Sequence, residues 1–407
     1  MKHDFPILGK NMKGHRLVYL DSTNTSLTPV SVTKAMNTYY HGYRANIHRA
    51  VYPLSEEATA AYEGAREKVR AFVGAKSHRE IIFTRNATES INLVAQTWGR
   101  VNLGKSDTVV LSLMEHHSNL VPWQILQQDK KFQIVYLSIT KDGRLNLAEL
   151  KKVLKTKKVK LVSLVHQSNV LGTINPAKKI VKMGHEHGAK VLIDGAQAVG
   201  HFPVNVLDLG ADFYVFTGHK MLGPTGIGVL YGKENILEAM PPFLGGGDMI
   251  RSVGIEGSTW NDLPHKFEAG TPNIAGAIGL GEAIDYLNHQ GMKNIHRHEQ
   301  KLLAYALKKL KKIPELRIIG PSTFKDRGAS VTFDLKGIHP HDLATLLGER
   351  GICVRAGNHC AQPLHDFLGL SATTRASLYL YNSRRDIDAL TNGIREIQTI
   401  FSSPVRS

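Results

Sequence analysis

The sequence predicts an α/β protein whose main sheet is mostly parallel. Between residues 80 and 230, short apolar runs alternate with turns and amphipathic stretches. The runs are Ile81 to Phe83, Val109 to Leu113, Leu161 to Val165, Val191 to Ile193 and Phe213 to Phe216. Strands that alternate with helices need crossover connections, and these produce parallel pairing with helices on both faces of the sheet. The length of 407 residues allows more than one domain.

Beyond about residue 290 the pattern becomes that of a smaller α+β domain. A long helical stretch begins at Met292 and ends at Lys312, because Pro314 cannot continue a helix. Short strands and a closing helix are expected at 329–335, 352–355, 376–381 and 386–401. We therefore predict a large domain over residues 20–290 and a small domain over residues 291–407, with residues 1–19 packed against the small one.

The composition is that of a globular enzyme with an excess of positive charge. With 51 Lys and Arg against 35 Asp and Glu, the formal net charge is +16. The basic residues are scattered or lie on expected helix faces, as between Lys151 and Lys160, without interleaved aromatic side chains. This pattern favours a solvated surface, and the alternative is attraction to nucleic acid or to an acidic protein partner.

Cys353 and Cys360 are the two cysteines of the chain and lie in one segment. Two cysteines build neither a disulfide framework nor a four-cysteine metal site, so we expect reduced thiols and no metal. The N-terminal residues lack the apolar stretch of a signal peptide, and no apolar run approaches ~18 residues. These observations favour a cytoplasmic protein that does not span a membrane.

Polar side chains follow each of the five apolar runs. In α/β sheets ligands bind at the carboxyl ends of the strands, so these side chains are candidates for a site. They are Asn86, Ala87 and Thr88; His116 and His117; His166 and Asn169; Asp194 and Gln197; and Thr217, His219 and Lys220. One such cluster could be turn chemistry, but five clusters on one expected edge indicate a site.

Lys220 and Asp194 form the most informative pair of these side chains. A lysine amine at a strand end can form an imine with an aldehyde cofactor, and an acid at a neighbouring strand end can keep a pyridinium nitrogen protonated. Together they indicate pyridoxal phosphate. A lone lysine before a glycine turn is more often a surface residue, and a lone aspartate there is more often a helix cap. The surrounding Thr217, His219 and glycines favour the cofactor site.

Asn86, Ala87 and Thr88 precede an expected helix, where free backbone N–H groups and the helix dipole favour an anion such as a phosphate. An N-cap alone would explain the same residues, but Thr217 and His219 could add donors at the same edge. His117 could stack on the cofactor ring and shuttle protons near neutral pH.

Cys360 lies in the loop sequence VRAGNHCAQP, which is the setting of an accessible thiol. An unperturbed thiol is mostly protonated at neutral pH, so a nucleophilic role needs nearby positive charge. Arg355, His359 and Arg375 are candidate sources. Cys353 lies inside an apolar stretch, and we expect it in the core. The GPTGIG segment at 223 lacks the glycine spacing of a dinucleotide fingerprint.

The motifs together resemble the group II, SufS-like cysteine desulfurases, in the class V aminotransferase superfamily of fold-type I pyridoxal-phosphate enzymes. The resemblance covers nearly the whole chain, from YLDS near residue 19 to TRASLYLYN at 374. Its other segments are HGYRANIHRA at 41, MEHHSNLVPWQ at 114, SNVLGT at 168, DGAQAVG at 194, FTGHKMLGPTGIG at 216, FEAGTPN at 267 and RAGNHCAQP at 355. It implies a mostly parallel seven-stranded sheet and a small domain that carries the cysteine loop.

The resemblance also implies a role for each matching residue. Lys220 binds the cofactor covalently, Asp194 pairs with its ring nitrogen, and His117 stacks on the ring. The other implied cofactor contacts are Gln197 to the phenolic oxygen, Ala87, Thr88, Thr217 and His219 to the phosphate, Asn169, and Thr271 from the partner subunit of a homodimer. The implied substrate contacts are Arg375 and Asn169 at the carboxylate and His48 and Arg355 at the entrance.

The implied reaction converts L-cysteine to L-alanine. Lys220 removes the α-proton, and Cys360 attacks the substrate sulfur and keeps it as a persulfide. The sulfur then passes to a SufE- or SufU-like acceptor protein and an iron–sulfur scaffold. A selenocysteine lyase and an aminotransferase are the alternatives on the same fold, and a basic binding protein with a lapsed cofactor site is the alternative outside enzymes.

Two segments depart from the family pattern. Thr23, Asn24 and Thr25 stand where small, Ala-rich residues are usual at the mouth of the site, so substrate access is in question. Asn86-Ala87-Thr88 stands where Gly-Thr-Thr is more common, which is the milder change because backbone amides do much of the phosphate binding.

Overall fold

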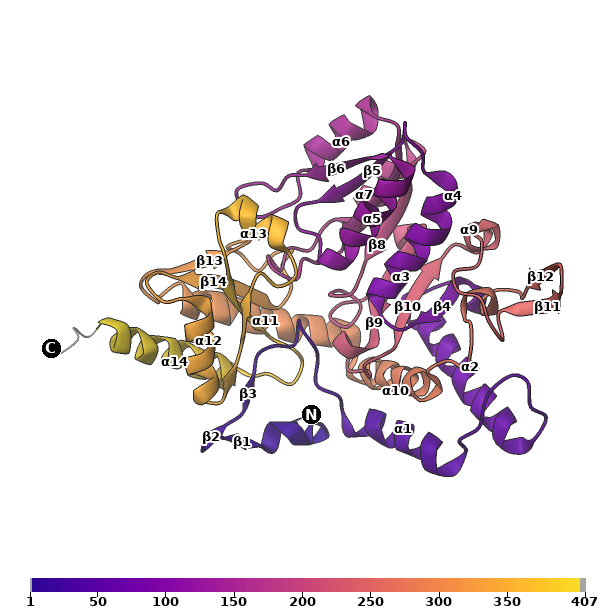
Figure 1. Cartoon of the computed structure of the whole chain (residues 1–407). Coiled ribbons are helices and arrows are strands. Elements are labelled where there is room, and N and C mark those ends of the chain that lie inside the picture. The colour runs from indigo at the N-terminus through magenta and orange to yellow at the C-terminus, as the bar shows by residue number, and fades with distance from the viewer. Residues whose placement is uncertain (1, 403–407) are drawn as a thin grey trace.

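The computed structural model describes residues 2–402, and a seven-stranded sheet lies at its centre (Figure 1). The order of the strands is β4-β10-β9-β8-β7-β5-β6. Their bounds are β4 (Ile81–Thr84), β5 (Thr108–Ser112), β6 (Gln133–Leu137), β7 (Val159–Val165), β8 (Lys190–Asp194), β9 (Phe213–Thr217) and β10 (Gly228–Gly232). Of the seven strands, β10 runs antiparallel to both neighbours and the other pairs are parallel. The predicted α/β fold with a mostly parallel seven-stranded sheet is confirmed.

All five apolar runs of the sequence are strands of this sheet, whereas β6 and β10 are not among them. β6 lies at the sheet edge with half-exposed side chains, so it lacks a continuous buried run. β10 begins at Gly228 and ends at Gly232, and glycines weaken a strand pattern. A Cβ at Gly228 would lie 2.5 Å from the backbone of Asn86, so the close approach of β10 to that turn requires glycine.

Helices cover both faces of the sheet, and each face has its own core. In β4, the side chains of Ile81 and Phe83 join one buried cluster, whereas that of Ile82 joins the other. Successive side chains of a strand point to opposite faces, so a continuous apolar run fits this arrangement. The helices of this region are α1 (Val30–Gly42), α2 (Pro53–Val73), α3 (Ala87–Val94), α4 (Arg100–Asn102), α5 (Val121–Lys130), α6 (Leu147–Thr156), α7 (Ala177–His185), α8 (Val206–Leu209), α9 (Glu234–Ala239) and α10 (Ile274–Gln290).

The C-terminal part forms a four-stranded antiparallel sheet in the order β13-β14-β17-β16. Its elements are α11 (Met292–Leu310), β13 (Leu316–Ile319), β14 (Ser330–Leu335), α12 (Pro340–Glu349), β16 (Arg355–Gly357), α13 (Gln362–Leu368), β17 (Thr373–Ser377) and α14 (Arg384–Ser402). A third buried cluster joins these elements to Val18 and Leu20. Val18 thus packs with the C-terminal elements, whereas Phe5 belongs to the first buried cluster and contacts Tyr286 on α10.

Three local predictions in this region need correction. The strand expected at 352–355 is two strands, because β15 (Ile352–Cys353) pairs with β3 (Val18–Tyr19) and β16 pairs with β17. The strand expected at 376–381 ends at Ser377, where the chain turns and the backbone N–H of Tyr379 donates to Asn382 Oδ1 at 2.8 Å. Cys353 is half-buried against Met12 and does not lie in the core, because β15 is two residues long and sits at a sheet edge.

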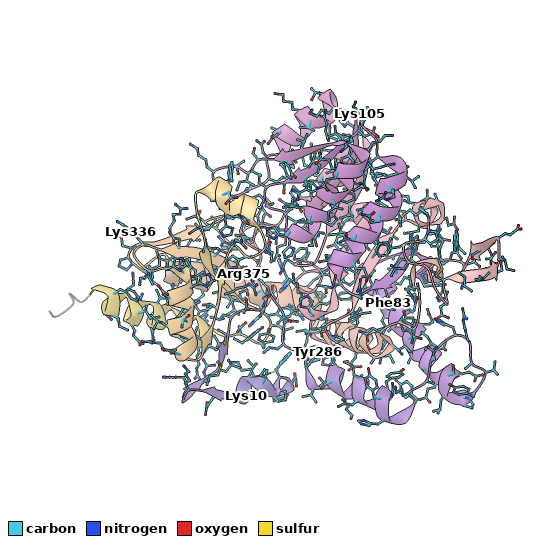
Figure 2. All side chains as sticks on the ribbon, in the orientation of Figure 1. Lys10, Phe83, Lys105, Tyr286, Lys336 and Arg375 are labelled. Atoms are coloured by element: carbon cyan, nitrogen blue, oxygen red, sulfur yellow. The ribbon has the colours of Figure 1, made fainter. Side chains whose placement is uncertain are left out.

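The positive charge is distributed over the surface. Lys10, Lys105 and Lys336 lie on three separate sides of the molecule (Figure 2). The side chains of Lys151, Lys152 and Lys155 on α6 are exposed, as a solvated helix face requires. Among residues 2–402, no helix combines the length and the apolar character needed to cross a membrane.

A buried ion pair fastens α2 to β4 and to the segment before Thr271. The guanidinium of Arg66 donates to both carboxylate oxygens of Glu268, at 2.7 and 2.9 Å, and to the carbonyl of Ile81 at 2.9 Å. Glu268 also accepts the backbone N–H of Phe83 at 2.7 Å. Arg66 is fully buried, so water could not hydrate its guanidinium if these contacts were lost.

We expect Arg66→Leu to lower the free energy of unfolding by about 3–5 kcal/mol, because Glu268 would be a buried charge without its partner. Arg100→Leu removes an exposed ion pair with Asp129 and should cost under about 1 kcal/mol. Urea unfolding of both variants measures the difference. Equal losses in the two variants would contradict this view of the Arg66 contacts.

Candidate active site

The strand ends enclose a cavity of about 240 Å³ at the carboxyl edge of the large sheet. Most of its lining comes from the ends of β4, β5, β7, β8 and β9 and the turns that follow them, and Asn24 comes from the segment after β3. The lining residues are Asn24, Asn86, Ala87, Thr88, His116, Ser118, Val165, Asn169, Asp194, Ala196, Gln197, Thr217, His219 and Lys220. The sequence therefore identified most of this lining, because parallel strands bring their carboxyl ends to one edge.

Asp194 and Lys220 face the same cavity from adjacent strands. Asp194 is 2% exposed, and burial raises the pKa of its carboxyl, while a 3.0 Å hydrogen bond from the Ala196 backbone N–H and the charge of Lys220 act against that rise. Burial lowers the pKa of Lys220 to about 8, and the Asp194 charge opposes this shift. The cavity thus contains two unusual groups. The Asp194 carboxylate is buried and is stabilised by a nearby cation, and the Lys220 amine is partly neutral near pH 7.

One end of the cavity is suited to an anion. The side chain of Asn86 caps α3 by accepting the backbone N–H of Glu89 at 3.0 Å. Ala87 and Thr88 form the first turn of α3, where backbone N–H groups have no partner within the helix. Thr217 and His219 line the same cavity. A phosphate group fits this donor set.

Two buried polar atoms in the lining have no hydrogen-bond partner among the described residues. They are Gln197 Oε1 and Asn169 Oδ1. The amide groups of both side chains are fixed, since Gln197 donates to the Thr23 carbonyl and Asn169 to the His359 carbonyl, each at 2.7 Å. Buried polar atoms of this kind indicate a ligand with polar groups of its own. The lining therefore fits pyridoxal phosphate at the amine, the acid, the phosphate end and the polar middle.

Of the two consecutive histidines after β5, His116 lines the cavity, whereas the sequence analysis assigned the ring contact to its neighbour His117. Burial and the charge of Lys220 lower the pKa of His116 to about 3, so its imidazole is neutral at pH 7. Its Nδ1 is paired with the hydroxyl of Ser118 at 2.8 Å. Consecutive histidines at a strand end cannot be told apart by position in the sequence, because the turn decides which one points inward.

His117 contacts the loop that carries Cys360. The backbone N–H of His117 donates to the Cys360 carbonyl at 2.8 Å, and His117 Nε2 accepts the backbone N–H of Gln362 at 3.1 Å. Burial lowers the pKa of His117, which favours the neutral ring that can accept this bond. His117 therefore holds the start of α13 and the Cys360 backbone against the turn after β5.

Cys360 is half-buried, and it follows His359, whose carbonyl accepts from the cavity-lining Asn169. Its loop is strained, since His359 and Cys360 both adopt positive φ values, 52° and 57°. Cys360 is close enough to Lys220 and Arg375 for its charge to raise the pKa of both. The amine and the thiol thus belong to one connected site.

Of the three expected sources of positive charge near Cys360, His359 is excluded. Burial lowers its pKa to about 2, so the ring is neutral, and its Nε2 is paired with the Thr373 hydroxyl at 3.0 Å. Arg375 is 2% exposed, and its pKa is lowered by burial to about 10, which leaves it charged at neutral pH. It donates to the Asn169 carbonyl at 3.0 Å, and its buried Nε has no partner among residues 2–402. Arg375 also pairs with Asp21 Oδ1 at 3.5 Å, so its Nε is the donor left for a further anionic group.

The segment Thr23 to Thr25, which differs from the family pattern, contacts residues that line the cavity. The Thr23 carbonyl accepts the amide of Gln197, and the Thr25 hydroxyl donates to the His219 carbonyl at 3.1 Å. Asn24 lines the cavity, and its amide donates to Asp21 Oδ2 at 3.1 Å. The small residues usual in the family are thus replaced by an amide side chain at the mouth of the site.

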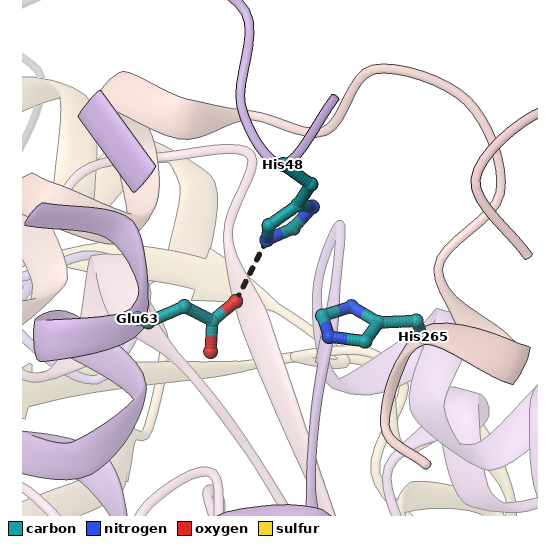
Figure 3. A group of neighbouring side chains, drawn as sticks. All are labelled: His48, Glu63 and His265. Carbon is teal, nitrogen blue, oxygen red and sulfur yellow. Dashed lines mark hydrogen bonds and ion pairs between the residues drawn. The ribbon is translucent and has the colours of Figure 1, made fainter. Parts of the chain in front are cut away.

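His48 and Thr271 lie outside the Lys220 cavity of their own chain. His48 pairs with Glu63 and contacts His265 (Figure 3). Thr271 lines a second cavity of about 300 Å³, which is also lined by Tyr62, Phe83 and Glu268. Arg355 lies on β16, paired with Arg375 on β17, and is half-buried.

A lysine and a buried acid at neighbouring strand ends, beside a helix N-terminus suited to phosphate, define a pyridoxal-phosphate enzyme. The model of the aminotransferase class-V family matches residues 18–390. The chain belongs to that family, and its near relatives there are cysteine desulfurases.

Two curated relatives cover almost the whole chain. A probable cysteine desulfurase of Halalkalibacterium halodurans is 50% identical over 98% of each chain. A cysteine desulfurase of Haloferax volcanii is 47% identical over 99% of this chain and 97% of its own. Among solved structures, a cysteine desulfurase of Escherichia coli is 40% identical with a TM-score of 0.90, covering 98% of this chain and 97% of its own.

The lowered pKa of Lys220 predicts how fast cofactor-free protein takes up pyridoxal phosphate. Uptake requires the neutral amine, so its rate should rise about tenfold per pH unit below pH 8 and level off above it. An exposed lysine would keep rising to beyond about pH 10. Absorbance of the bound cofactor measures the rate. In Asp194→Asn the plateau should begin at lower pH, because the charge that raises the pKa of Lys220 is removed.

The contact between His117 and Gln362 predicts a positioning role for His117. His117→Ala should speed hydrogen exchange of the Gln362 amide by roughly tenfold, because one hydrogen bond to the loop is lost. His117→Gln keeps an acceptor and should recover part of the protection. Unchanged exchange in His117→Ala would show that the bond does not hold the loop.

Proposed function

We propose that this chain is a cysteine desulfurase, which converts L-cysteine to L-alanine and keeps the sulfur on Cys360 as a persulfide. The observation that carries the proposal is the half-buried thiol of Cys360 beside the cavity of Lys220 and Asp194. The desulfurase relatives, about half identical over nearly the whole chain, support it.

Different residues of the cavity would bind different parts of the cofactor. The first turn of α3 with Thr217 and His219 would bind the phosphate, and Asp194 would pair with the ring nitrogen. His116 would lie against the ring, in the place that the sequence analysis gave to His117. Pyridoxal phosphate, when bound, supplies an electron sink for bonds broken at the substrate α-carbon.

The chain's own groups then carry the proton and the sulfur. Arg375 would bind the substrate carboxylate, since its buried Nε is free, and Asn169 would support it. Lys220 would move the α-proton, because its lowered pKa allows it to exist in both protonation states near neutral pH. The Cys360 thiolate would attack the substrate sulfur. An S–S bond forms, the C–S bond breaks with its electron pair left on the substrate carbon, and protonation there gives alanine.

We also propose a homodimer in which Thr271 reaches the site of the partner subunit. The support is that Thr271 does not line the Lys220 cavity of its own chain. The half-buried Cys360 loop is suited to hand sulfur to an acceptor protein of the SufE or SufU type for iron–sulfur assembly. Two unpaired cysteines support a location in the cytoplasm.

Cys360→Ala should retain bound cofactor and its yellow colour but lose alanine formation from cysteine by more than roughly a hundredfold, because the sulfur has no nucleophile to leave with. The matched control is Cys353→Ala, which removes the other thiol and should keep full turnover. Mass spectrometry after exposure to cysteine should locate one added sulfur atom on Cys360. Full turnover in Cys360→Ala would reject the persulfide and favour aminotransferase-type chemistry.

A further inference from the structure

Three potential metal ligands converge at a place where none of them lines the Lys220 cavity of the chain. His48 lies in the loop between α1 and α2, Glu63 on α2, and His265 on the short turn η7 (His265–Phe267) (Figure 3). One ring nitrogen or carboxylate oxygen of each lies within 4.8 Å of the others. Within residues 2–402, these three residues form the one group of His, Cys, Asp or Glu side chains that close together.

The distances suit a shared ion. His48 Nε2 and Glu63 Oε1 are 3.0 Å apart, and the rings of His48 and His265 have centroids 4.7 Å apart. Ligand atoms about 2.0–2.2 Å from a tetrahedral zinc ion lie roughly 3.3 Å from one another. The His48–Glu63 pair is already near that spacing, so a small movement of His265 or His48 would complete the set.

The charge around Glu63 favours a cation. Arg66 contacts both Glu63 and Glu268, so this network holds two carboxylates and one guanidinium. The network of Arg66, Glu63 and Glu268 therefore carries one excess negative charge, and His48 and His265 are the side chains beside Glu63. A divalent ion between Glu63 and the two imidazoles would balance that charge.

The ligand atoms are oriented and reachable. The carboxylate of Glu63 is oriented by Arg66, which donates to Oε2 at 2.8 Å and to Oε1 at 3.3 Å, and Oε1 lies 3.0 Å from His48 Nε2. The ring of His265 makes no hydrogen bond within residues 2–402, and it lies with its centroid 4.7 Å from that of His48. The side chains of His48 and Glu63 are 25% and 32% exposed, so an ion can enter from solvent.

We propose that His48, Glu63 and His265 bind one divalent transition-metal ion of the zinc type. Two imidazoles and one carboxylate with open positions form a ligand set that suits Zn²⁺, whereas Mg²⁺ and Ca²⁺ prefer oxygen ligands throughout. The ion replaces the hydrogen bond between His48 and Glu63. It ties the loop after α1 to α2 and η7, and none of the three ligands lines the Lys220 cavity.

The test is Zn²⁺ binding to metal-stripped holoenzyme, measured by isothermal titration calorimetry, with Co²⁺ absorption to report the ligand geometry. The background variant Cys360→Ser removes the reactive thiolate as a competing ligand. We expect one ion per chain and a higher melting temperature with Zn²⁺. This readout needs no turnover, so it is independent of the proposed desulfurase activity.

His265→Gln and His48→Gln should each weaken Zn²⁺ binding by at least about tenfold, since each removes one of three ligands. The control is His341→Gln, which disrupts an exposed, stacked histidine pair with His339 elsewhere on the surface and should leave binding unchanged. Wild-type affinity in both ligand variants, or no binding by the holoenzyme, would overturn the proposal. Circular dichroism confirms that the variants are folded.

Discussion

The buried carboxylate of Asp194 is the constraint on which the site depends. A carboxylate at 2% exposure, with a hydrogen bond from Ala196, costs free energy unless a cation faces it. The charge of Lys220, which follows the next strand, stabilises this carboxylate in part. A protonated ring nitrogen of the cofactor would stabilise it further. Because β8 and β9 are adjacent parallel strands at the sheet centre, the separation of acid and amine is fixed by backbone pairing. The remaining lining is arranged around this pair.

The small domain adds the thiol and the guanidinium to that cavity. The segment after β7 is the junction, since Asn169 donates to the His359 carbonyl at 2.7 Å and accepts from Arg375 at 3.0 Å through its own carbonyl. The Thr332 hydroxyl donates to the Val170 carbonyl in the same segment. Cys360 and Arg375 are thus placed by contacts with one short stretch that contains Asn169 and Val170.

Part of the cavity lining followed from chain position, and the rest did not. Asp194, Lys220, Gln197 and Thr88 were predicted at one site because strand ends gather at one edge, and all four line the cavity. His116 and His117 could not be separated, since a tight turn decides which imidazole faces the cavity. His359 was expected to be a positive charge, but burial keeps its ring neutral, and burial is a property of the packed domains. The contact of Gln197 with the Thr23 carbonyl joins residues far apart in sequence and carries no local signal.

The sequence by itself determined the α/β class, five of the seven strands of the large sheet and the chemical groups of the site. Apolar runs, glycine turns and the residues that follow each strand are local, and local patterns reflect backbone geometry directly. Tertiary structure alone decided which groups share a cavity, which imidazoles are neutral, and where Cys360 lies relative to Lys220. It also brought His48, Glu63 and His265 together. These outcomes depend on burial and on contacts between distant segments, which arise only when the layers pack.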